Sequence, residues 1–170
     1  TAAASGEPRG ARVKDLLRQV FAQTLAELDA GVAMAPVLAD YRVRAMQGAA
    51  FLVFAYGKAA RAMTMAVVSQ IHGARLRGLV VPPEPDAAPL PPFEVIPGGH
   101  PIPSAGSLRA GERALQLAHT VTADETVLFL ASGGGSAMLE SPIDPAITLH
   151  ETQSLYRALV SCGAPILDVN

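Results

Sequence analysis

The chain has 170 residues, 50% of them apolar and 16% charged, a composition that excludes an intrinsically disordered chain and is typical of one globular domain. The net charge is −2 and the 13 lysine and arginine residues are scattered along the chain, so we expect no nucleic-acid partner. No segment approaches the roughly 18 continuous apolar residues of a membrane helix, and the single cysteine, Cys162, allows no intrachain disulfide, so we expect a cytoplasmic protein without a membrane partner.

The N-terminal part of the chain is predicted to be helical. Residues 1–12 have the composition of a frayed end, and residues 13–28 place apolar side chains on one face of a helix. The seven apolar residues of this face are Val13, Leu16, Leu17, Val20, Phe21, Leu25 and Leu28. Gly31 is the expected end of this helix, and residues 36–45 carry a weaker helical pattern.

Two buried strands and a helix are predicted next. Residues 50–55 form a short, continuous apolar run that is typical of a strand buried on both faces, and residues 78–81 form another. Between them, Gly57 is followed by a helical pattern over residues 58–72. Residues 82–92 contain six prolines, which exclude a helix or a central strand and predict a stiff surface connection.

The second half of the chain continues this alternation of strands and helices. Residues 93–96 return to a strand pattern, and residues 107–120 read as a helix despite the glycine at position 111. Residues 126–130 form the clearest strand of the sequence and run directly into the glycine-rich segment 132–136, which leads into a short helical segment.

A last helix is predicted from a capping box at its start. Thr148 and Glu151 have the spacing of such a box. The residues expected to face inward from this helix are Leu149, Leu155 and Leu159. Cys162, near its end, is expected to be a small core residue, and residues 165–170 begin an extended segment.

Short buried strands that alternate with helices determine the expected fold class. They predict an α/β fold with a doubly wound, mainly parallel, Rossmann-like sheet and helices on both faces. In such sheets, ligands bind in the loops beyond the carboxyl ends of the strands. Two loops are therefore candidates for a site: the loop after residues 50–55 and the loop after residues 126–130.

The glycine-rich loop carries the strongest signal for binding chemistry. It consists of Ser132, Gly133, Gly134, Gly135 and Ser136. Consecutive glycines expose backbone amides and permit positive φ angles, which builds an anion-binding nest to which serine hydroxyls can add donors. A plain flexible turn is the alternative. The loop does not fit the dinucleotide-binding GxGxxG pattern, because Met138 takes the place of its third glycine, and the chain carries no P-loop.

Lys58 and His100 are two further candidates. Lys58 stands where a strand ends and a helix begins, so its ammonium group can reach a phosphate, although a cation there opposes the helix macrodipole. The alternative is a solvated lysine. His100, in the turn after residues 93–96, is either a structural donor or a group of the site. The remaining histidines show no metal-ligand spacing and are expected on the surface: His72, His119 and His150.

Four segments, taken together in their order and spacing, resemble one family. They are VFAYGKAARAM (53–63), EVIPGGHPIP (94–103), LFLASGGGSAML (128–139) and ITLHETQSLYRALVSCGAPILDVN (147–170). Over residues 13–170 the chain is similar to the N-terminal domain of MOFRL-associated glycerate 2-kinases, which are also called hydroxypyruvate reductases. The resemblance implies transfer of the γ-phosphoryl group of ATP to the 2-hydroxyl of D-glycerate, with Mg²⁺, in a cleft between this domain and a smaller C-terminal domain.

The resemblance also implies roles for individual residues. The catalytic lysine of the family maps onto Lys58, its phosphate- and substrate-binding glycine loop onto residues 132–136, and its loop histidine onto His100. The metal ligands stay unknown, with Glu140 and Asp144 as the acids nearest to the loop, and no general base is assigned.

The chain departs from the family pattern at three places. Tyr56 replaces a small residue, and the turn at residues 103–105 lacks the usual aspartate, which changes the shape of the pocket. The sequence stops at Asn170, where the family continues, so we expect a truncated domain that is inactive by itself.

Two other classes of function stay open. One is a hydroxypyruvate reductase, which is disfavoured because no GxGxxG pattern follows a strand. The other is a non-catalytic domain whose exposed apolar surface supports binding or a homodimer.

Overall fold

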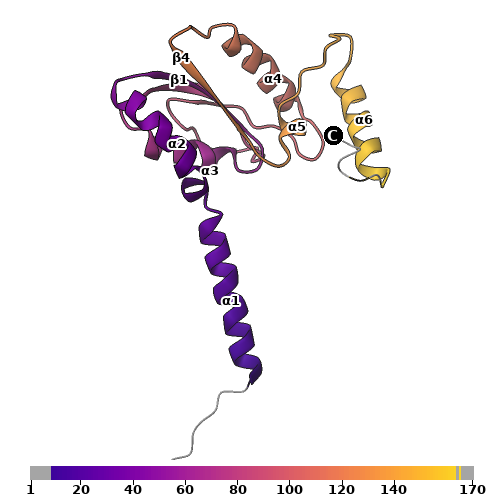
Figure 1. Cartoon of the computed structure of the whole chain (residues 1–170). Helices are drawn as coiled ribbons and strands as arrows, with labels where there is room; N and C mark the ends of the chain where they lie inside the picture. The colour runs from indigo at the N-terminus through magenta and orange to yellow at the C-terminus, as the bar shows by residue number, and fades with distance from the viewer. Residues whose placement is uncertain (1–8, 164, 166–170) are drawn as a thin grey trace, which may run out of the picture.

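The structure is a computed structural model that describes residues 9–163 and 165. Helices and strands are interspersed along the chain, and the strands form one four-stranded sheet (Figure 1). In chain order the elements are α1 (Arg9–Glu27), α2 (Ala30–Met46), β1 (Ala50–Tyr56), α3 (Ala60–Gln70), β2 (Arg75–Val81), β3 (Glu94–Val95), α4 (Ala105–Ala118), β4 (Glu125–Ala131), α5 (Gly135–Met138) and α6 (Leu149–Ser161). Among the described residues, none of these helices has the length and apolar character needed to cross a membrane.

The sheet is parallel and doubly wound, as predicted. Its strand order is β3-β2-β1-β4, and every paired strand runs parallel to its neighbour. The chain steps from β1 to β2 and β3 in one direction and then returns to place β4 on the other side of β1. The direction of winding therefore reverses between β1 and β4. In open parallel sheets this reversal opens a crevice at the carboxyl ends of the two strands, where ligands bind.

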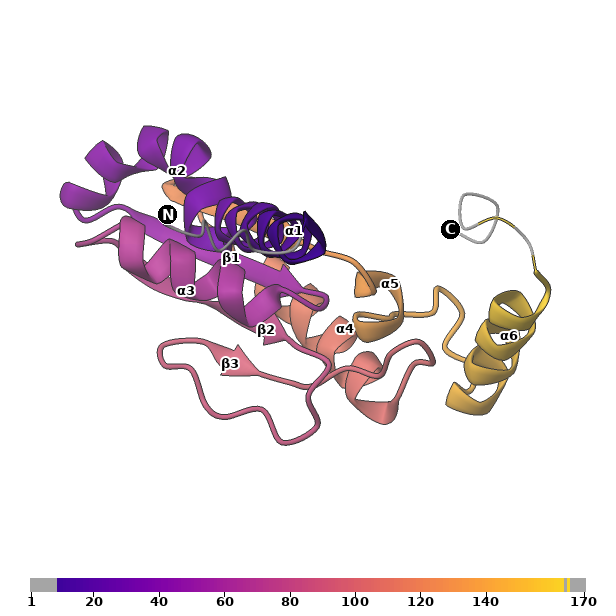
Figure 2. The same cartoon turned by 90° about the horizontal axis from the view of Figure 1, so that it is seen from below.

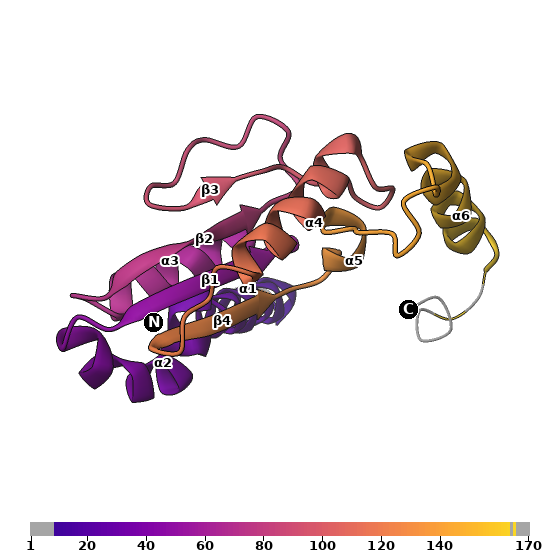
Figure 3. The same cartoon turned by 90° about the horizontal axis from the view of Figure 1, so that it is seen from above.

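Helices cover both faces of the sheet because successive side chains of β1 point to opposite sides. Phe51 and Val53 pack with α2 and α3 on one face. Leu52 and Phe54 pack with α4 and α5 on the other face (Figures 2 and 3). The continuous apolar run of residues 50–55, predicted to be buried on both sides, is the central strand of this core.

The boundaries at the N-terminal end differ from the sequence prediction. α1 begins at Arg9, so residues 9–12 form its start rather than a frayed end, and residues 1–8 lie outside the described residues. Gly31 does not end a helix. It lies in the first turn of α2, because the carboxylate of Asp29 accepts hydrogen bonds from the amides of Gly31 and Val32 at 2.8 and 3.3 Å and caps that helix.

The last helix is present, but its apolar face is not buried as predicted. The capping box of Thr148 and Glu151 is confirmed. Leu155, expected to face inward, is 57% exposed, and Cys162, expected in the core, is exposed as well. The reason is the position of α6, which lies beyond the carboxyl ends of the strands rather than over a face of the sheet (Figure 1). The extended segment expected at residues 165–170 lies outside the described residues, except for position 165.

An ion pair joins the two strands that flank β1. Arg77 in β2 donates from Nε and Nη2 to the two carboxylate oxygens of Glu125 in β4, both at 2.6 Å. The Glu125 side chain is only 5% exposed, whereas that of Arg77 is 37% exposed. The hydrogen bonds from Arg77 lower the pKa of Glu125 below its usual value. The carboxylate therefore contributes stability above the pKa of the unfolded chain, about 4.3, and this contribution is lost as the pH falls through the lower folded pKa.

We expect Glu125→Gln to lower the free energy of unfolding at pH 7 by about 2 kcal/mol, because a charge-assisted, bidentate hydrogen bond is lost at a buried position. Urea denaturation at pH 7 and at pH 3 measures this change, and the difference from the wild type should shrink at pH 3. Glu94→Gln is the matched control: its pair with Arg113 is also 2.6 Å long but exposed on both sides, so the loss should be below about 0.5 kcal/mol. Equal losses for the two variants would contradict this account.

Candidate active site

The carboxyl ends of β1 and β4 bring the two predicted loops into direct contact. Tyr56 and Ala131, the last residues of the two strands, are paired in the sheet. The amide of Ser132 donates to the carbonyl of Tyr56 at 3.1 Å, and the amide of Lys58 donates to the carbonyl of Gly133 at 3.0 Å. Two segments more than 70 residues apart in sequence therefore form one junction at the reversal point of the sheet.

Gly57 allows the closest approach within this junction. Its φ angle is +102°, a conformation that favours glycine. A Cβ atom at this position would lie within 2.5 Å of both the carbonyl oxygen and the hydroxyl oxygen of Ser132. The turn that carries Lys58 and the glycine-rich loop can pack this tightly only because position 57 has no side chain.

The hydroxyl group of Ser132 is engaged within the protein. It accepts a hydrogen bond from the amide of Ala59 at 2.9 Å and donates its proton to the carbonyl of Tyr56 at 3.2 Å. The sequence prediction treated Ser132 as a donor to a bound anion. In the structure its single proton points to a protein carbonyl, so Ser132 holds the loop in place next to α3.

The remainder of the glycine-rich loop leaves several amides free. Gly134 has a φ angle of +84° and precedes the short helix α5. The amide of Gly135 donates to the carbonyl of Ser132 at 3.3 Å. The amides of Gly133, Gly134 and Ser136 have no hydrogen-bond partner among the residues that the structure describes. Three of the four amides expected to form an anion-binding nest are thus available to a ligand, and the fourth is used inside the loop.

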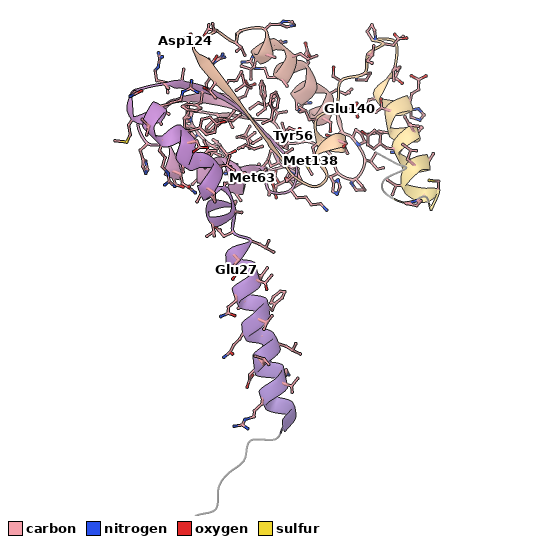
Figure 4. All side chains as sticks on the ribbon, in the orientation of Figure 1. Glu27, Tyr56, Met63, Asp124, Met138 and Glu140 are labelled. Atoms are coloured by element: carbon pink, nitrogen blue, oxygen red, sulfur yellow. The ribbon has the colours of Figure 1, made fainter. Side chains whose placement is uncertain are left out.

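A cavity of about 550 Å³ opens over this loop. Two rings pack against its glycines: a Cβ at Gly134 would lie 2.8 Å from Nδ1 of His100, and a Cβ at Gly135 would lie 2.6 Å from the ring of Tyr56. Tyr56 also packs with Met138 in the core beneath the cavity (Figure 4). The residues lining the cavity are Tyr56, His100, Pro101, Ala131, Ser132, Gly133, Gly134, Gly135, Ser136, Ala137, Tyr156 and Val160. The predicted loop and His100 therefore share one cavity.

Lys58 lies next to the loop but outside the lining of this cavity. It sits in the turn before α3, is exposed, and forms no ion pair with any described residue. Its backbone is bound to Gly133. The other three histidines, predicted to be surface residues, are exposed, as the sequence indicated.

Tyr156 is the residue of this site that the sequence analysis missed. From α6 its hydroxyl donates to the carboxylate of Glu140 at 2.6 Å, and the carbonyl oxygen of Ser136 lies 3.3 Å from the same hydroxyl oxygen. Burial and the neighbouring carboxylate raise the pKa of Tyr156 above its usual value. Helical spacing could place Tyr156 on α6, but no local pattern indicated that α6 closes one side of the cavity.

The two acids nearest to the loop are already engaged. Glu140 accepts the hydrogen bond from Tyr156, and Oδ1 of Asp144 accepts one from the amide of Ala146 at 2.8 Å. Within the described part of the chain, no group of three or more His, Cys, Asp or Glu residues could hold a metal ion.

The structure is a doubly wound α/β domain with a cavity at its topological switch point. The family described as a domain of unknown function (DUF4147) matches residues 16–170. The chain belongs to this family.

Relatives and a solved structure agree with this assignment. The D-glycerate 2-kinase of Thermotoga maritima is 36% identical over 121 residues, which are 70% of this chain and 28% of that protein. A putative hydroxypyruvate reductase of Agrobacterium vitis is 31% identical over 157 residues, 92% of this chain and 34% of that protein. The crystal structure of glycerate kinase from Thermotoga maritima superposes with a TM-score of 0.73 at 29% identity, covering 94% of this chain and 37% of that chain.

The comparisons confirm the resemblance to MOFRL-associated glycerate 2-kinases that the four sequence segments indicated. They also show its extent: the chain spans about a third of the length of these relatives.

Proposed function

We propose that this domain forms the phosphate-handling half of an enzyme that transfers the γ-phosphoryl group of ATP to the 2-hydroxyl of D-glycerate. The relatives named glycerate kinase support the reaction class. The free amides of Gly133, Gly134 and Ser136, together with His100, would contact phosphate or the carboxylate of the small-molecule substrate, and Lys58 would supply positive charge. Phosphoryl transfer relies on positioning and charge stabilisation more than on covalent chemistry, and free amides beside one cation suit that requirement.

A single observation carries this proposal, and it concerns Gly133. Among the glycines from position 31 to position 163, it alone has neither a positive φ angle nor any atom within 4 Å of the point where a Cβ would lie. The fold therefore does not require glycine there. A glycine that the fold does not need, lining a cavity beside free amides, indicates close approach of a ligand to the backbone.

ATP and Mg²⁺ are part of the proposal. Magnesium is usually held by few protein carboxylates together with substrate phosphates, so we infer a metal that enters with the nucleotide. When bound, it would neutralise phosphate charge. This chain's own residues would bind and orient the phosphates through the loop amides, and Ser132 would keep that loop against the turn of Lys58.

We expect Gly133→Ala, placed at the equivalent position of an intact family member, to raise the KM for ATP or glycerate about 10-fold, the cost of one weakened charge-assisted contact. The melting temperature should stay within about 1 °C because nothing lies against the new methyl group. Steady-state assays with ATP and D-glycerate, read as 2-phosphoglycerate formed, measure the kinetics. An unchanged KM for both substrates would remove the main support for ligand binding at the loop.

A second assay, with NADH and hydroxypyruvate, tests the alternative activity. A hydroxypyruvate reductase would oxidise NADH in the presence of hydroxypyruvate, and we expect no oxidation above background because no dinucleotide-binding pattern follows any strand. NADH oxidation without phosphorylation of glycerate would overturn the kinase proposal. The chain of residues 1–170 alone is expected to show no turnover, since a second wall of the cleft would come from another domain.

A further inference from the structure

Helix α1 presents an apolar face that nothing in the structure covers. It projects from the body of the molecule and contacts α2 (Figure 1). All seven apolar residues of the face predicted from the sequence are between 52% and 69% exposed: Val13, Leu16, Leu17, Val20, Phe21, Leu25 and Leu28. An isolated helix of 19 residues is marginally stable in water, and helices with such a face are normally stabilised by packing it. We therefore expect the apolar face of α1 to pack against another surface.

The apolar positions of residues 13–28, which run from α1 to the residue just after it, are nearly symmetric about a point between residues 20 and 21. Three pairs of positions, equidistant from the point between residues 20 and 21, are apolar at both members: Val13 with Leu28, Leu16 with Leu25, and Val20 with Phe21. Leu17 mirrors Thr24, whose hydroxyl already donates to the carbonyl of Val20 at 2.9 Å. If a second α1 packed antiparallel about a twofold axis at this point, apolar side chains would lie at the same level at these three pairs of positions between residues 13 and 28.

The charges of this segment favour the same arrangement. The first half of α1 carries Arg9, Arg12, Lys14 and Arg18 against one acid, Asp15, whereas its end carries Glu27 and is followed by Asp29. Antiparallel pairing places the basic half of one helix against the acidic end of the other and also opposes the two helix dipoles. Parallel pairing would place like charges side by side.

We propose that α1 is a dimerisation element that pairs antiparallel with α1 of a second copy of this chain. The interface is isologous, with Val20 and Phe21 of both copies at the twofold axis. This inference goes beyond the proposed activity and does not depend on it, because no residue of α1 lines the cavity over the glycine-rich loop.

Light scattering and sedimentation at increasing concentration test the pairing on the chain of residues 1–170. We expect the wild type to be a dimer and Phe21→Glu, which places two charges at the axis, to raise the dimer Kd at least about 100-fold. Gln19→Glu, on the polar side of the same helix, is the matched control and should leave the Kd unchanged. Circular dichroism should show that the sheet-containing body stays folded in both variants, since α1 stands apart from it.

A charge exchange tests the direction of pairing. Glu27→Arg should weaken the dimer, and adding Lys14→Glu to the same chain should restore it, because positions 14 and 27 are equidistant from the twofold axis and approach each other only between antiparallel copies. A monomeric wild type, a dimer that Phe21→Glu leaves intact, or a double variant weaker than Glu27→Arg alone would each overturn the proposal. A polypeptide of the relatives' length that is monomeric while residues 1–170 dimerise would assign the face to another domain and overturn it as well.

Discussion

Replacing Lys58 by methionine in an intact family member is expected to lower the rate of phosphoryl transfer about 10³-fold, equivalent to about 4 kcal/mol of transition-state stabilisation. Lys58 is exposed, and no carboxylate of the described residues forms an ion pair with it. Its backbone is bound to Gly133, which keeps the side chain near the free amides of the loop. A cation at the start of a helix opposes the macrodipole, so local stability does not account for a lysine there.

The stability of the Lys58→Met variant should be nearly that of the wild type, because an exposed, unpaired side chain contributes little. Rapid-quench measurement of the phosphoryl-transfer step, alongside thermal denaturation, separates the two effects. Lys14→Met, at the only other lysine of the chain, removes the same charge from α1 and should leave the rate unchanged. A Lys58→Met protein that unfolds, rather than one that is merely slow, would make Lys58 a structural residue and leave the glycine-rich loop to carry the functional argument.

Gly57→Ala is expected to lower the free energy of unfolding by about 3 kcal/mol, the largest stability change predicted for this chain. Two costs add at this position. An alanine at a φ angle of +102° is strained, by about 1 to 2 kcal/mol. The new methyl group also meets the backbone and hydroxyl oxygens of Ser132 within 2.5 Å, and backbone atoms can yield only by separating the two loops, at about 1 to 3 kcal/mol.

Gly48→Ala separates these two contributions. Gly48 has a φ angle of +76° but no atom within 4 Å of the position where a Cβ would be, so only the backbone strain applies and the loss should be about 1 kcal/mol. Urea denaturation of both variants measures the difference. If Gly48→Ala costs as much as Gly57→Ala, the contact between the Lys58 turn and Ser132 contributes nothing to stability, and the junction between the two loops is not as close as the structure shows.

The sequence alone predicted the fold class, and it placed the two candidate loops at the same end of the sheet. The apolar runs at residues 50–55 and 126–130 became β1 and β4. β1 is buried along its length because a strand covered on both faces needs continuous apolar residues, whereas β4 lies at the edge of the sheet and leaves Phe129 68% exposed. The alternation of strands and helices restricts the topology through right-handed crossovers. It follows that the two candidate loops lie at the same edge of the sheet, and the structure places them in direct contact.

Only the tertiary structure decided how individual side chains are used. Ser132 was predicted to bind a ligand, but its hydroxyl contacts Tyr56 and Ala59, residues more than 70 positions away, through the register of β1 with β4. Tyr156 entered the site because α6 packs beside the loop, where its hydroxyl contacts Glu140 and Ser136, residues 16 and 20 positions earlier in the chain. Local patterns contain no information about such partners.

Periodicity also left the surroundings of the apolar helix faces undetermined. The spacing of residues 13–28 and of α6 correctly placed their apolar side chains together, yet Phe21, Leu155 and Cys162 are exposed. The physical reason is that helical spacing determines which side chains share a face, whereas burial depends on what packs against that face. The amino-acid sequence by itself determined the sheet, its helices and the glycine-rich loop at the switch point; the three-dimensional packing decided which surfaces were covered and which were left for a partner.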